Sequence, residues 1–182
     1  AYSAVIAKVR CIPGCAPDGR RDGRLISIAL MMQDYQSGSY SFNNLKKPLS
    51  EFLLARCEAT VSPEDLYLTE PIYIELSVDV WVETAQQDQA FQIQNLLTAR
   101  IREFIDPLGD SGGWEIGKLP DENRFAMLLR TTKMDAVVRR FCVSVRRVEH
   151  DGVHECGLND LPRSPFMIGV NGEHRVHVMF VG

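Results

Sequence analysis

Residues 72–83 read IYIELSVDVWVE and alternate strictly between aliphatic side chains and polar or aromatic ones. This period-two pattern predicts a β-strand with one buried face. The aliphatic positions are Ile72, Ile74, Leu76, Val78, Val80 and Val82. A one-residue slip in register would move all of them into water, so the pairing of this strand is tightly specified.

Two helices and a second strand are predicted to follow it. Thr84 is the expected N-cap of an amphipathic helix, and Asp121 is the expected N-cap of a shorter one. The apolar positions of the first helix are Phe91, Ile93, Leu97, Ile101 and Phe104. Residues 137–148 then form a strand, which makes residues 63–148 a β-α-α-β subdomain.

The N-terminal part of the chain predicts a smaller β-β-α subdomain, residues 1–62. Residues 4–12 alternate like a half-buried strand, and residues 25–32 resemble a more fully buried one. Between them lies a cluster of proline and glycine residues. An amphipathic helix over residues 45–56 follows, with Pro48 in its first turn.

The remaining segments complete an α+β prediction of two helix-on-sheet subdomains. Residues 57–71 form a connector, because they hold Pro63 and an acidic pair. Residues 149–182 are expected to be a C-terminal extension that ends in a β-hairpin, turning at Asn171-Gly172.

Composition and charge limit the classes of function. The chain has 182 residues, 45% of them hydrophobic, and a net charge of -4. This charge disfavours general nucleic-acid binding or adhesion to an anionic membrane. Acidic residues interrupt the most apolar stretch, so no bilayer span is expected. The opening residues resemble a strand, so no secretory leader is expected. Five cysteines are too few for a disulfide scaffold and favour a reducing compartment.

One set of residues could serve a metal or a thiol. Cys11 and Cys15 flank a Pro-Gly turn, and His150, His154 and Cys156 cluster near the other end. They suggest a small zinc-binding or thiol-dependent enzyme as an alternative function. The fixed pairings of established zinc motifs are absent. The competing interpretation places Cys11 and Cys142 inward as small apolar side chains.

The polar face of the 72–83 strand is the candidate interaction surface. Its members are Tyr73, Glu75, Asp79, Trp81 and Glu83. The carboxylates could be imagined as an acid-base or cation site, but a solvated face or an interface explains them better. Two arginine doublets, Arg139-Arg140 and Arg146-Arg147, are expected to pair with this acidic strand or with a partner.

A glycine-rich run interrupts the second subdomain. It contains Gly112, Gly113, Trp114 and Gly117, without the Lys-Ser/Thr of a P-loop or the spacing of a dinucleotide fingerprint. We interpret it as a structural turn in which glycines adopt positive φ angles and Trp114 fills an apolar gap.

The order of these segments resembles the C-terminal part of the baseplate J-like family, the wedge proteins of phage tails and contractile injection machines. The stretches that carry the resemblance are residues 9–14, 23–28, 49–56, 71–80, 104–108 and 112–118. The most specific is GGWEIGK, residues 112–118, which is similar to the Gly-Gly-Trp-x-x-Gly-Lys/Arg run of that family. The loop after Met32 is longer than in the family, and residues after Glu149 have no counterpart there.

This resemblance implies a structural component and no enzyme. Its expected partners are other baseplate wedge proteins and copies of itself. It implies no cofactor, metal, nucleic acid, membrane or small-molecule substrate. The protein is expected in the cytoplasm during assembly and then in a phage tail or injection particle.

Overall fold

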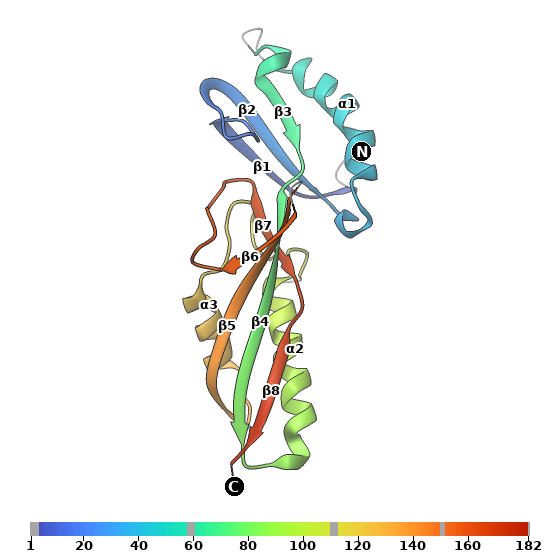
Figure 1. The fold of residues 1–182 in the computed structure, drawn as a ribbon. Coiled ribbons are helices and arrows are strands. Elements are labelled where there is room, and N and C mark those ends of the chain that lie inside the picture. Colours follow the sequence, from blue (N-terminus) through green and yellow to red (C-terminus); the bar gives the residue numbers. More distant parts are fainter. Residues whose placement is uncertain (1–3, 58–60, 110–112, 150–151, 182) are drawn as a thin grey trace. The chain divides into compact units, whose positions relative to one another are not determined.

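The computed structural model describes residues 4–57, 61–109, 113–149 and 152–181. The fold is α+β, as predicted, with helices packed on two separate sheets (Figure 1). Short 3-10 helices lie at Tyr35–Ser37, Pro63–Asp65 and Gln87–Gln89.

The chain forms two compact units. The first contains the described residues up to Ile72 together with Glu115–Gly117 and Ser164–Met167, and the other described residues form the second. The main boundary therefore follows Ile72, whereas the sequence analysis places it after residue 62. Residues 149–182 do not form a separate body, because Ser164–Met167 belongs to the first unit and the rest of their described part belongs to the second.

The first unit is a three-stranded sheet with one helix. Its elements are β1 (Ile6–Cys15), β2 (Arg21–Met32), α1 (Tyr40–Leu54) and β3 (Leu66–Thr69). β1 and β2 are antiparallel, and β3 lies parallel to β2. Apolar residues of α1, β2 and β3 form its core: Leu30, Met32, Phe42, Leu45, Leu49 and Leu68.

The predicted β-β-α order is confirmed here, with two differences. β3 lies inside residues 57–71, which the sequence predicts to be a connector. The strand was missed because four residues are too few to show a clear alternation. The helix begins at Tyr40, so Pro48 lies inside it and not in its first turn. Buried Phe42 anchors these early turns and offsets the weak helix propensity of the Ser- and Asn-rich sequence.

The second unit is a five-stranded sheet with two helices. Its elements are β4 (Ile72–Thr84), α2 (Ala90–Ile105), α3 (Glu122–Thr131), β5 (Val137–Glu149), β6 (Gly152–Gly157), β7 (Met167–Asn171) and β8 (Arg175–Phe180). The strand order is β6-β5-β4-β7, and β8 also pairs with β4. α2 contacts β8, α3 contacts β5, and the two helices contact each other.

β4 has the two faces that its sequence predicts. Ile74, Leu76, Val78, Val80 and Val82 are all 0% exposed, whereas the alternate residues are half-buried. On α2, Ile93, Leu97, Ile101 and Ile105 are buried as well. The aliphatic face of β4 is therefore the core of this unit.

Two details of α2 differ from the prediction. Phe91, predicted to begin the apolar stripe, is 71% exposed. The stripe instead extends at the other end of the helix to Ile105, which is buried. Thr84 does not cap the helix, since it is the last residue of β4 and its hydroxyl donates to the carbonyl of Asp135 at 3.0 Å. Asp121 does cap α3, because its carboxylate accepts a hydrogen bond from the N–H of Arg124 at 2.8 Å.

The C-terminal strands are present, but they do not form the predicted hairpin. β8 runs parallel to β4, with Asp79 opposite Arg175 and Thr84 opposite Phe180. β7 also pairs with β4. The chain therefore continues along one edge of β4, and the Asn-Gly pair marks an interruption between two collinear strands.

Two glycines of the described part of the glycine-rich run, Gly113 and Gly117, have positive φ angles. Gly113 has a φ of 54°, and the Trp114 indole N–H donates to the carbonyl of Phe104 at 2.8 Å. Gly117 has a φ of 81°, and a Cβ there would lie 2.6 Å from the carbonyl oxygen of Pro165 and against the Arg10 guanidinium. Gly112 lies outside the described residues.

Gly117→Ala is predicted to lower the free energy of unfolding by about 3 kcal/mol, because it combines a left-handed backbone with a steric overlap. Gly19 is the matched control, since its φ is 87° but nothing lies within 4 Å of its Cβ position. Gly19→Ala should therefore cost only about 1 kcal/mol. Urea denaturation measures both values, and equal losses would contradict the overlap at Gly117.

The two faces of β4 predict different costs of truncation. Val80→Ala should lower the free energy of unfolding by about 2–3 kcal/mol, since it leaves a cavity in the core. Glu75→Ala should lower it by less than about 1 kcal/mol, because Glu75 lies on the solvated face. Thermal or urea unfolding tests this, and a larger loss for Glu75→Ala would contradict the assignment of faces.

Candidate interaction surface

The face of the second sheet opposite the core presents charged and aromatic side chains. Strand alternation places Tyr73, Glu75, Asp79, Trp81 and Glu83 of β4 on this face, and all of them are half-buried. The sequence analysis predicted these residues as a common surface. β5 and β8 flank them on the two sides of β4.

Arginines of β5 pair with the acidic residues of β4. Glu75 is opposite Arg146, and the two form an ion pair at 3.5 Å. The Arg139 guanidinium donates to the carboxylate of Glu83. These pairs confirm that both arginine doublets include a residue that neutralises the acidic strand. Each pair contributes little to stability, because the four side chains keep much of their contact with water.

Trp81 stands between two side chains in register on neighbouring strands. The Arg140 guanidinium carbon lies 4.4 Å from the centre of the indole ring. The His177 ring stacks on the indole with a centroid distance of 4.8 Å and an interplanar angle of 16°. We call Arg140, Trp81 and His177 the Trp81 stack. Cation-π and aromatic contacts hold the indole in one orientation.

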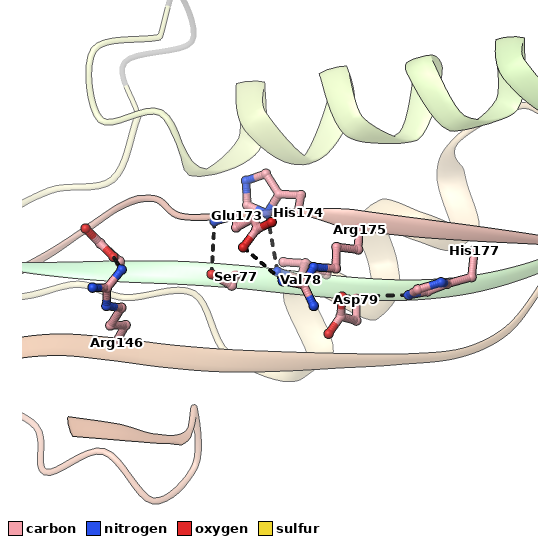
Figure 2. Close-up of polar contacts among 9 residues, drawn as sticks. Ser77, Val78, Asp79, Arg146, Glu173, His174, Arg175 and His177 are labelled. Carbon is pink, nitrogen blue, oxygen red and sulfur yellow. Dashed lines mark hydrogen bonds and ion pairs between the residues drawn. The ribbon is translucent and has the colours of Figure 1, made fainter. Parts of the chain in front are cut away.

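β8 adds a second basic border to the acidic strand. Arg175 lies opposite Asp79, and His177 Nε2 lies 3.9 Å from the same carboxylate (Figure 2). The Arg175 guanidinium donates to Glu173 at 3.0 Å, and this bond raises the pKa of Arg175 above its usual value. The surface therefore has an acidic centre between two basic borders.

Sequence reasoning missed the contribution of β8. Arg175 and His177 were assigned to a hairpin strand, and no local pattern shows that this segment pairs in parallel with a strand nearly one hundred residues earlier. Arg140 was identified as part of a doublet, but its position on Trp81 depends on the register of β5.

The predicted metal and thiol residues do not form a site in the described part of the chain. No group of three or more His, Cys, Asp or Glu residues there could hold a metal ion. Cys15 belongs to the first unit, Cys156 to the second, and both are half-buried thiols. His150 and the His154 side chain lie outside the described residues.

The prediction that two cysteines point inward as small apolar side chains is wrong. Cys11 and Cys142 are both exposed. Cys11 lies on β1, next to the buried residue Ile12, and Cys142 lies opposite Asp79 on the polar face of the second sheet. A cysteine in an alternating strand takes the face that its position dictates, and here that face is exposed in both strands.

Two hollows mark the helical side of the second unit. One of about 490 Å³ lies between α2 and the end of α3, and one of about 160 Å³ lies between α3 and β5. The larger is lined by Leu96, Arg100, Leu128, Thr131, Thr132 and Lys133. These residues supply two cations but no nucleophile with a base beside it.

Within the described ranges no helix has the length and apolar character needed to cross a bilayer.

Comparison with models of known protein families finds no match to this chain, and comparison with curated protein sequences finds no similar protein. The geometry of the outer sheet face therefore carries the functional argument.

Proposed function

We propose that this protein is a structural component of a phage-like baseplate or contractile injection apparatus, and that it assembles with other wedge proteins and with copies of itself. The resemblance of residues 5–148 to the baseplate J-like family supports the class of machine. The outer sheet face supports the mode of action, because it combines an oriented tryptophan with arginines and acidic residues. The single observation that carries the proposal is the Trp81 stack.

The Trp81 stack has the chemistry of an interface centre. Tryptophan and arginine dominate the residues that contribute most to protein-protein binding. Trp81 is already fixed by Arg140 and His177, so a partner would lose little side-chain entropy by contacting it. The surrounding Glu75–Arg146 and Glu83–Arg139 pairs form a polar rim that can select a partner by charge.

Strand addition is a poorer explanation for assembly through the first unit. β1 is an edge strand of its sheet, but Pro13 interrupts its donors and the register shifts between Ile6 and Lys8 and again after Pro13. The other edge, β3, has only four residues. Prolines, bulges and short edges protect a sheet against edge-to-edge pairing. Edge-to-edge pairing of the first sheet is therefore disfavoured.

Native mass spectrometry tests the proposed assembly directly. The full-length protein, co-purified with the products of its neighbouring genes, should give hetero-oligomers of defined stoichiometry. The same spectra report bound metal. A monomer that carries one zinc ion would contradict the assembly and favour the alternative function of Cys15, His150, His154 and Cys156.

The combined change Glu75→Lys and Asp79→Lys should weaken the partner complex at least tenfold, because it reverses the charge of the centre of the surface. The unfolding midpoint should change little, since both residues are partly solvated. Asp88→Lys combined with Glu103→Lys is the control, with the same charge change at exposed positions away from the sheet. Equal affinities for both double variants would remove this face as the binding site.

A further inference from the structure

The junction between β7 and β8 is held on β4 by successive hydrogen bonds. Gly172 N–H donates to the carbonyl of Leu76 at 3.0 Å, and Glu173 N–H donates to the hydroxyl of Ser77 at 3.1 Å. His174 then accepts a hydrogen bond at Nδ1 from the N–H of Val78, at 3.3 Å (Figure 2). An imidazole thus takes the place of a strand carbonyl at this point of β4.

The other ring nitrogen connects this junction to α2. Asn171 donates through its side-chain N–H to the carbonyl of Arg102 at 3.0 Å, so its side-chain oxygen faces His174 Nε2, also at 3.0 Å. This oxygen can only accept, and Nε2 must therefore carry the proton. The chain of bonds from Arg102 through Asn171 and His174 to Val78 requires a neutral imidazole with its proton on Nε2.

A protonated His174 does not fit these partners. With a proton on Nδ1, the ring would direct a donor at the N–H of Val78, and that strand donor would lose its acceptor. Among the described residues, the charged group that acts on the ring is the cation Arg102, which disfavours a second positive charge. Residues 76–78 of β4 have no ionisable side chain, and α2 presents the cation Arg102.

Two acidic groups near this junction, Glu173 and Asp79, have other partners. Glu173 pairs with Arg175, and Asp79 lies on the outer face with His177. Burial, together with the positive charge of Arg102, lowers the pKa of His174 to about 4 from its ordinary value of 6.5. Geometry and electrostatics both favour the neutral ring.

We propose that His174 is a pH-sensitive latch, which holds the C-terminal strand β8 on β4 while its imidazole is neutral and loosens β8 when the imidazole is protonated. β8 is six residues long and carries Arg175 and His177 of the candidate interaction surface. Its release would separate His177 from Trp81 and leave one edge of β4 open. The latch does not depend on the proposed function, although its opening would dismantle the surface on which that function rests.

The direction of the pH effect follows from the lowered pKa. The attached strand has a His174 pKa of about 4, and a detached strand regains about 6.5. The attachment of β8 is fully stabilised above pH 6.5. It becomes weaker as the pH falls toward 4, because the detached state binds the proton more readily. With these two pKa values, the equilibrium constant for detachment of β8 rises about 30-fold when the pH falls from 8 to 5.

Hydrogen exchange of the full-length protein tests the latch. Amide exchange in residues 176–180 is measured at pH 8 and pH 5 and corrected for the intrinsic pH dependence of exchange. The wild type should show about 30-fold more opening of β8 at pH 5. His174→Asn keeps an acceptor near the N–H of Val78 but does not titrate, and it should show less than a threefold change. Amides of β5, which pairs with the other side of β4, serve as the internal control.

Two more variants separate the latch from other effects. Asn171→Ala removes the acceptor at Nε2 and should increase β8 opening already at pH 8. His177→Gln removes the imidazole of β8 itself and should retain the wild-type response. Three results would overturn the proposal: equal pH responses of the wild type and His174→Asn, loss of the response in His177→Gln, or an equal increase in β5.

Discussion

The burial of one face of β4 is the constraint on which the second unit depends. Five consecutive inward residues of this strand are completely removed from water, so its register toward every neighbour is fixed by the core. The opposite face must then point outward along its whole length. Glu75, Asp79 and Trp81 reach the surface because their neighbours in sequence are buried, and the candidate interaction surface is the reverse side of the hydrophobic core.

Local patterns predicted the elements but not their pairing. The alternation of β4, the apolar stripe of α2 and the cap at Asp121 are readable within a few residues, since each depends on nearby side chains. β3 and β8 both pair in parallel with strands far away in the sequence. Parallel strands are not joined by a tight turn, so no turn sequence indicates their pairing. The Asn171-Gly172 pair has the sequence of a hairpin turn but does not form one here. The predicted hairpin failed for that reason.

The candidate surface was predictable to the same extent. Its β4 residues are predicted by the alternation of side chains along one strand, and the arginines of β5 by their charge complementarity to that strand. The stack on Trp81 could not be inferred, because it depends on Arg140 and His177 arriving in register from two other strands. His174 gave no signal at all, since a histidine in a polar loop acquires its role only from the strand donor and the amide that it meets.

β8 links the surface and the latch. Its outward residues complete the basic border of the surface, while the residue just before it closes the bond chain between α2 and β4. The charges of the outer face neutralise one another largely within the unit, so the face can remain solvated without a partner. Its shape depends on β8 staying in place. A single neutral imidazole on the buried side thus contributes to the geometry that a partner would meet on the exposed side.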